Sequence, residues 1–365
     1  MKRIIKNLKK KKTMKNLAIL ITLLLVHYSF GQKPFKFEGK EVAPGTREHF
    51  EIPLVHEGDS TLIPITIFNG VTAGETLGIT AGVHGYEYPP ILGAQRLIKS
   101  IDPATLKGTV ILVQIANLKS FLDRKPFMKP ADTENLNRVF PGKKDGNLSE
   151  QIAYYITNSI INRVDYFLDM HAGDAAEDLM SYGAFYRNTH KPEISAIGKR
   201  MALALGFDHI VTFNTDGKDY MNAESPSLYT SAEAFKQGIP SIDIECGRLG
   251  IADAEAAKQV EQAVLNLLSE LNFTPKAESV PAVPTIIIEN RIYTDSAVDG
   301  IFYPLKEAGN YVVRGMKLGY ITDFFGNIKE TVYAEANGLL LLILGTPPVN
   351  KGETLTVNYS LVAPD

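Results

Sequence analysis

The chain has almost no means of covalent cross-linking, because Cys246 is the only cysteine among its 365 residues. No intrachain disulfide is therefore possible, and the fold must be stabilised by its hydrophobic core. A hydrophobic run long enough to span a bilayer is also missing, since the apolar segment Leu17–Val26 is too short. The chain is 45% hydrophobic and 22% charged, which is not the composition of a disordered protein. Its length is sufficient for one large domain and a second, smaller domain.

Basic residues are fewer than acidic residues once the N-terminal segment is set aside. Residues 32–365 carry 30 Lys and Arg against 41 Asp and Glu, a net charge of −11. Nucleic-acid-binding proteins usually present a basic surface, so we expect no nucleic-acid partner. The sequence leaves the oligomeric state open.

The N-terminal segment, residues 1–31, predicts a signal peptide. It contains eight Lys and Arg and no Asp or Glu, and the apolar segment Leu17–Val26 is followed by a small-x-small cleavage pattern at residues 29–31. Met14 is an alternative start, which leaves the true first residue open. No cysteine follows the apolar segment, which argues against a lipoprotein anchor. We expect an exported protein, periplasmic or secreted, with no membrane span after the signal is removed.

Two hydrophobic patterns divide the remaining chain. In residues 32–273, strand-like runs alternate with amphipathic helical segments, which is typical of an α/β fold with a mainly parallel mixed sheet and helices on both faces. The proline-rich residues 274–284 predict a linker, and residues 285–365, with short apolar runs between glycines, predict a small all-β barrel or sandwich. The expected strands are Phe50–Val55, Thr61–Phe68, Leu77–Val83, Thr109–Ile115, Tyr166–Met170, His209–Phe213 and Ile239–Cys246, and the expected helices are Ile91–Ser100, Ser149–Val164, Pro192–Leu205, Ser231–Lys236 and Asp253–Leu271.

The stretch Gly82–Pro90 carries the first candidate metal ligands. It lies between an expected strand and an expected helix, so it predicts a sharp turn. His84 and Glu87 are three residues apart in this turn, where their side chains can face one point. Zinc accepts nitrogen and oxygen ligands and, in catalytic sites, takes three protein ligands plus a water. Such a pair is more often a solvated loop or a local hydrogen bond, so a zinc site requires a third ligand.

Further candidates lie at the ends of later strands, where α/β sheets bind their ligands. His171 follows its strand directly and is the best third ligand, with a hydrogen-bonded core histidine as the alternative. Asp169, on the same strand face, is suited to orient a neighbouring ligand or to be a structural aspartate. Glu245 is suited to be a general base or part of a structural salt bridge. Cys246 points to the opposite strand face, which disfavours it as a nucleophile.

The long polar loop between residues 116 and 147 supplies possible substrate contacts. Arg138 offers a planar guanidinium that matches a carboxylate, and the adjacent Asn137 adds donors to the same anion. The alternative is a surface arginine that tethers its own loop. Arg124, earlier in the loop, is a further candidate that no neighbouring motif supports.

Four motifs follow one another along the chain: His84-Gly85-Tyr86-Glu87, Asn137 to Gly142, Asp169-Met170-His171, and Gly238 to Gly247 with Glu245. Their order resembles that of the succinylglutamate desuccinylase/aspartoacylase family of zinc amidohydrolases, which are related to the zinc carboxypeptidases. The likeness extends from about Val42 through the C-terminal β region, which is similar to lipoyl-like sandwich domains and is expected to cap the pocket.

The resemblance implies one zinc ion per chain, held by His84, Glu87 and His171. It also implies Glu245 as general base, Asn137 with Arg138 as the site for a substrate carboxylate, and Arg124 as the group that polarises the scissile carbonyl. Tyr86 stands where members of the family commonly have Asn or Asp. Because this residue is not a metal ligand, the difference bears on the shape of the pocket and not on zinc binding.

We therefore expect a zinc-dependent hydrolase that cleaves the amide bond of an N-acyl amino acid or a similar carboxylate-bearing molecule. One alternative is an exported zinc carboxypeptidase that acts on peptides or cell-wall stem peptides. Another is a non-catalytic binding protein with the same fold. The joint presence of the three expected zinc ligands and Glu245 argues against the non-catalytic alternative.

Overall fold

The computed structural model describes residues 31–126, 134–275 and 285–360. The expected signal peptide, apart from Gly31, and most of the expected linker lie outside these residues. No helix in the described ranges is long and apolar enough to cross a membrane.

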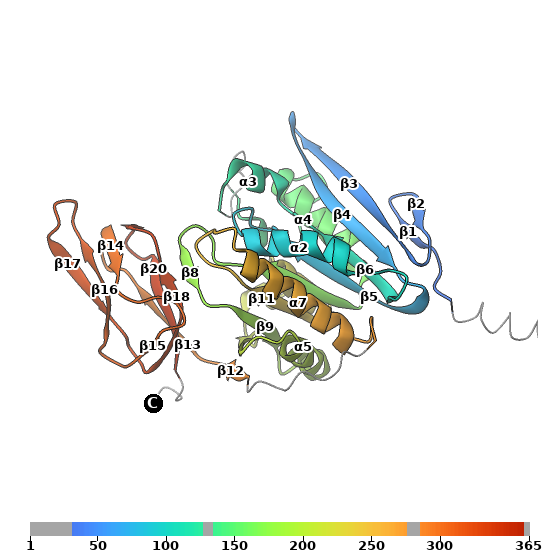
Figure 1. Cartoon of the computed structure of the whole chain (residues 1–365). Coiled ribbons are helices and arrows are strands. Elements are labelled where there is room, and N and C mark those ends of the chain that lie inside the picture. Colours follow the sequence, from blue (N-terminus) through green and yellow to red (C-terminus); the bar gives the residue numbers. More distant parts are fainter. Residues whose placement is uncertain (1–30, 127–133, 276–284, 361–365) are drawn as a thin grey trace, which may run out of the picture.

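A nine-stranded mixed sheet forms the centre of the larger domain (Figure 1). Its strand order is β12-β10-β9-β11-β7-β5-β6-β4-β3. The neighbours in this order pair in parallel except β9 with β11, β4 with β6, and β3 with β4. The strands are β3 (Thr46–His56), β4 (Asp59–Asn69), β5 (Thr72–Ala81), β6 (Lys107–Val113), β7 (Tyr166–His171), β9 (Tyr182–Arg187), β10 (His209–Asn214), β11 (Ser241–Glu245) and β12 (Ile286–Ile288).

Helices cover both faces of this sheet, which confirms the expected fold class. The alternation of side chains along β6 shows why: Val110 and Leu112 belong to one hydrophobic cluster, and Ile111 and Val113 to another. The first cluster includes residues of α2 (Tyr88–Ser100), α5 (Pro192–Ala204) and α7 (Ala254–Glu270). The second includes residues of α4 (Leu148–Ser159) and α6 (Thr230–Lys236) and packs against the small hairpin of β1 (Phe35–Phe37) and β2 (Lys40–Val42).

The C-terminal residues form the expected β domain, a pair of sheets around their own hydrophobic cluster (Figure 1). One sheet has the order β13-β20-β18-β15 and the other the order β17-β16-β14-β19. The strands are β13 (Arg291–Asp295), β14 (Gly300–Pro304), β15 (Tyr311–Val312), β16 (Lys317–Thr322), β17 (Ile328–Tyr333), β18 (Gly338–Leu344), β19 (Pro348–Val349) and β20 (Thr354–Ser360).

Two strands join one domain to the other. β12 follows the expected linker but pairs in parallel with β10 of the large sheet. Conversely β8 (Glu177–Leu179), which lies within the larger domain's sequence, pairs antiparallel with β18. The C-terminal domain was expected to start at residue 285, but the first strand after this residue, β12, belongs to the large sheet. An isoleucine run indicates a strand without indicating which strand it pairs with.

All the expected strands and helices are present, with ends shifted by a few residues. The helix expected at Ser149–Val164 is shorter, since α4 ends at Ser159 and a 3-10 turn, Ile161–Arg163, follows. The long polar loop contains α3 (Leu118–Asp123) and the 3-10 turn Leu136–Arg138. β9, an interior strand of the sheet between β10 and β11, was not expected.

Candidate metal centre and cavity

The turn between β5 and α2 brings the first two candidate ligands together as the sequence predicts. α2 begins at Tyr88, directly after Glu87, and prolines at its first turn lose no hydrogen bond there. Gly85 separates the two candidates and passes close to α3: a Cβ on this residue would lie 2.1 Å from the backbone nitrogen of Phe121. The turn therefore requires glycine at this position, and α3 supports it from outside.

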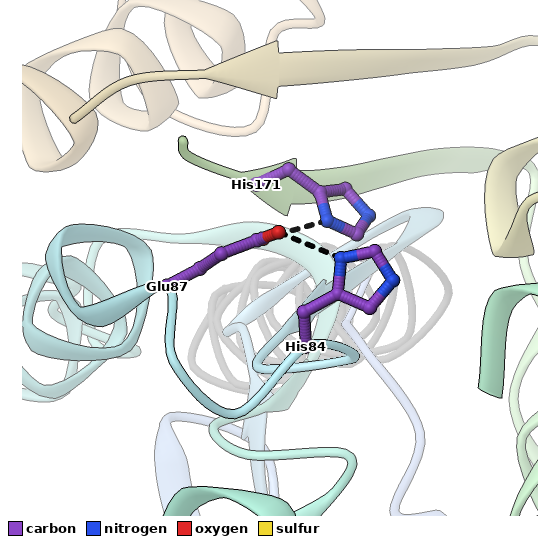
Figure 2. Close-up of side chains that lie close together, drawn as sticks. All are labelled: His84, Glu87 and His171. Carbon is purple, nitrogen blue, oxygen red and sulfur yellow. Dashed lines mark hydrogen bonds and ion pairs between the residues drawn. The ribbon is translucent and has the colours of Figure 1, made fainter. Parts of the chain in front are cut away.

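His84, Glu87 and His171 converge on one point (Figure 2). His84 Nδ1 lies 2.6 Å from Glu87 Oε1, and His171 Nδ1 lies 2.8 Å from Glu87 Oε2. One ligand atom from each residue falls within 4.8 Å of the others. Glu87 and His171 are buried, whereas His84 is partly exposed. Glu87 and His171 are separated by 84 positions in the sequence, yet together with His84 they form one group that could hold a metal ion.

The outer nitrogen of each histidine faces an oxygen. His84 Nε2 lies 3.1 Å from Asn135 Oδ1, and His171 Nε2 lies 3.0 Å from Asp169 Oδ2. A ring whose Nε2–H donates to such an oxygen presents its Nδ1 lone pair to a metal. Two imidazole nitrogens and one carboxylate are one of the ligand sets that zinc takes in catalytic sites. The donors present therefore fit a zinc ion, and Asp169 occupies the orienting position considered for it from sequence.

Charge in this group favours an ionised Glu87. Burial raises the pKa of Glu87, but the charges and hydrogen bonds of His84 and His171 lower it to about 2. Burial lowers the pKa of His171, whereas Asp169 and Glu87 raise it well above its usual value. The carboxylate is thus held in the charged form that a metal requires.

A cavity of about 380 Å³ opens onto the three residues. It brings together most of the site residues expected from sequence, because Asn137, Arg138 and Glu245 line it as well. Arg124 is not among its lining residues and lies exposed at the end of α3, with a left-handed backbone. Its expected role therefore has no geometric support in this structure and stays a prediction.

Glu245 lies at the end of β11, in register with His171 on the neighbouring parallel strand β7. Its pKa is raised well above its usual value, mainly by burial; His171 lowers it, and Glu87, Glu177 and Asp243 raise it further. Burial and the neighbouring Asp169 raise the pKa of Asp243 to about 7. A carboxyl group with a raised pKa is suited to accept and return a proton near neutral pH.

Asn137 and Arg138 form one wall of the cavity. Asn137 is buried, accepts hydrogen bonds from the backbone nitrogen and hydroxyl of Thr230, and places Nδ2 3.5 Å from His171 Nε2. Arg138 donates to the carbonyl of Leu228 at 2.6 Å, and its guanidinium lies 5.3 Å from the ring centre of Tyr229. The alternative of a loop tether is therefore partly correct, since Arg138 ties its loop to the segment before α6.

Sequence reasoning missed several polar residues of the cavity, among them Asn135, Asp174 and Glu177. Asn135 contacts His84 and caps the turn that holds Asn137. Asp174 and Glu177 follow β7, and burial raises the pKa of Glu177 to about 8. Their place just after a strand that ends in a candidate ligand was the available signal.

Cys246 is buried in the first hydrophobic cluster, away from the cavity lining. Its sulfur lies 3.4 Å from Gln259 Oε1 of α7, in agreement with the face expected from strand alternation.

Comparison with known proteins gives a consistent result. The sequence profile of the succinylglutamate desuccinylase/aspartoacylase catalytic domain matches residues 73–271. A curated relative, the N-alpha-acetyl-L-2,4-diaminobutyric acid deacetylase of Halomonas elongata, is 27% identical over 333 residues, which cover 88% of this chain and 93% of that protein.

Solved structures share the fold over most of their length. The succinylglutamate desuccinylase/aspartoacylase from Rhodobacter sphaeroides has a TM-score of 0.74 and 23% identity. The product-bound ectoine utilization protein EutE (DoeB) from Ruegeria pomeroyi has a TM-score of 0.76 and 22% identity. Each comparison covers 86% of this chain and 95% of the other.

Proposed function

Since the chain belongs to the succinylglutamate desuccinylase/aspartoacylase family, we propose that it is a zinc-dependent deacylase of N-acyl amino acids. The observation that carries the proposal is the convergence of His84, Glu87 and His171 beside Glu245 in one cavity. The likeness to a deacetylase of an N-acetylated diamino acid over 88% of the chain supports the same reaction class.

A zinc ion held by His84, Glu87 and His171 would supply Lewis acidity, which polarises a carbonyl and lowers the pKa of water. Glu245 accepts the proton of the attacking water and delivers it to the nitrogen of the amide as the C–N bond breaks. A carboxylic acid and a free amine leave the site. The buried surroundings of Glu245 stabilise its protonated form between these two transfers.

Arg138 and Asn137 bind the carboxylate of the substrate in this proposal. Arg138 is partly engaged by the Leu228 carbonyl through Nη1, and its remaining N–H groups are the donors for a carboxylate. Arg124 is proposed to polarise the scissile carbonyl, and Arg124→Ala tests this role on kcat. We also propose that the protein is exported, on the strength of its N-terminal residues.

The proposal is tested with zinc-loaded protein and a panel of N-acetyl amino acids, including N-acetyl-L-2,4-diaminobutyrate, alongside short peptides. Hydrolysis of the acetylated amino acids is expected, and exclusive hydrolysis of peptides would favour a carboxypeptidase instead. Glu245→Gln should retain zinc and lose about 10²- to 10⁴-fold in kcat. Glu270→Gln, a carboxylate at the far end of α7, is the matched control. Near-normal turnover by Glu245→Gln would remove Glu245 from the mechanism.

A further inference from the structure

Two parallel aromatic rings line the cavity, and a guanidinium lies against each of them. Phe213 of β10 and Tyr229, at the start of α6, have ring centres 6.1 Å apart and planes only 7° from parallel. Arg138 lies over Tyr229 at 5.3 Å, and Arg291 lies over Phe213 at 5.1 Å. We refer to these four side chains as the arginine–aromatic stack. They come from four separate segments of the chain.

Arg291 is the member of the stack that the C-terminal domain provides. It is the first residue of β13 and pairs with Tyr359 of β20. The side chain is partly buried, and within the described ranges no carboxylate forms an ion pair with it. Its guanidinium instead lies against Phe213, a residue of the cavity lining. Both arginines also offset part of the rise that burial causes in the pKa of Tyr229.

Arg138 lies at the other end of this stack. Its guanidinium has two supports, the carbonyl of Leu228 and the face of Tyr229. The ring of Tyr229 is parallel to that of Phe213, which also contacts Tyr186 at 5.4 Å, and Arg291 lies over Phe213. A planar guanidinium binds a carboxylate through two parallel hydrogen bonds only when its orientation is fixed. The two ring contacts therefore connect Arg291 with Arg138.

We propose that Arg291 is a positioning residue for carboxylate recognition, by which the C-terminal domain sets the affinity of the cavity for carboxylate-bearing substrates. The proposal rests on the proposed function, since it assumes that Arg138 binds the substrate carboxylate. Cation–π contacts of this kind make a modest contribution, and loss of the Arg291 contact is expected to weaken carboxylate binding by about three- to tenfold. The chemical step does not involve the stack, so kcat should stay within about twofold.

The test uses two probes that differ only in the group recognised, N-acetyl-L-alanine and its carboxamide, N-acetyl-L-alaninamide. Arg291→Ala should raise KM for the acid and leave KM for the amide unchanged, and Arg291→Lys should restore much of the loss because lysine keeps a cation on the ring. Arg314→Ala, an exposed arginine of the same domain, is the matched control. Equal effects on acid and amide would show a merely structural role and overturn the proposal.

A double-mutant cycle examines whether Arg291 acts through Arg138. The variant with both arginines replaced by alanine should bind the acid no more weakly than Arg138→Ala alone. Fully additive losses would show that Arg291 contacts the ligand by itself, and they would contradict positioning.

Failure of the proposed function can be recognised separately by measuring binding without turnover. In the zinc-loaded Glu245→Gln protein, calorimetric titration with N-acetyl-L-alanine should give a dissociation constant about three- to tenfold lower with Arg291 than with Arg291→Ala. Binding with this dependence but no hydrolysis by the wild-type protein would refute the deacylase and leave the positioning role intact. Equal affinities, or no binding of the acid at all, would refute the positioning role.

Discussion

Replacing Asp169 with asparagine is expected to weaken zinc binding by about 10- to 100-fold, the usual cost of losing a carboxylate behind a metal-ligating histidine. Asp169 is fully buried, and its Oδ2 accepts from His171 Nε2 at 3.0 Å while Oδ1 accepts from the Thr80 hydroxyl. Asparagine keeps the shape and one acceptor but removes the negative charge that makes the imidazole a stronger ligand. The expected loss corresponds to about 1.4–2.8 kcal/mol of zinc-binding free energy.

The assay is competition for zinc with a chromophoric chelator, performed on the wild-type protein and on Asp169→Asn. Asp243→Asn is the matched control, because Asp243 is aligned with Asp169 on the adjacent strand and is buried, but bonds to Ser231. The control should keep zinc affinity within about twofold. An unchanged affinity in Asp169→Asn, or an equal loss in both variants, would refute the view that Asp169 supports His171 as a ligand.

Other changes have defined outcomes. Gly85→Ala should destabilise the protein by about 1–3 kcal/mol in chemical denaturation and reduce its zinc content, because the added Cβ would meet the backbone of α3. Chelation of the metal should lower the melting temperature, and restored zinc should raise it again. Burial raises the pKa of Glu261, but hydrogen bonds from Ser100 and Arg96 bring it below its usual value overall. The carboxylate therefore stabilises the fold at neutral pH, and this contribution disappears as the pH falls through the folded-state pKa. Wild type should exceed Glu261→Gln by up to about 1 kcal/mol at pH 7 and lose this advantage at acidic pH.

The sequence was sufficient to predict the parts of the fold that depend on local periodicity. The β-branched run Thr109–Ile115 predicted a strand, and the structure forms β6 there with helices on each side of it. Asp253 indicated the start of the last long helix and caps it. The fold class followed from such patterns taken together.

Pairing between distant segments was not predictable in the same way. Residues 286–288 read as a strand, but nothing local indicates that this strand adds to the edge of the large sheet beside β10. β8 is only three residues long, and its sequence does not indicate that it pairs with β18. These pairings depend on tertiary packing.

The candidate site was predictable where a residue type and a strand end coincided. His171 and Glu245 follow this rule, and they occupy aligned positions on β7 and β11. Asn135 caps a 3-10 turn and Glu177 begins the short strand β8, and neither position was singled out from the sequence. The contact of Arg291 with Phe213 arises only from domain packing. Arg124 was proposed by resemblance across a loop whose path the sequence does not specify.

Anomalous diffraction at the zinc edge from crystals of the zinc-loaded protein tests the central claim most directly. The account predicts one zinc peak per chain, at about 2.0–2.2 Å from Nδ1 of His84, a carboxylate oxygen of Glu87 and Nδ1 of His171. A peak at other residues, or no peak with these three side chains ordered, would contradict it.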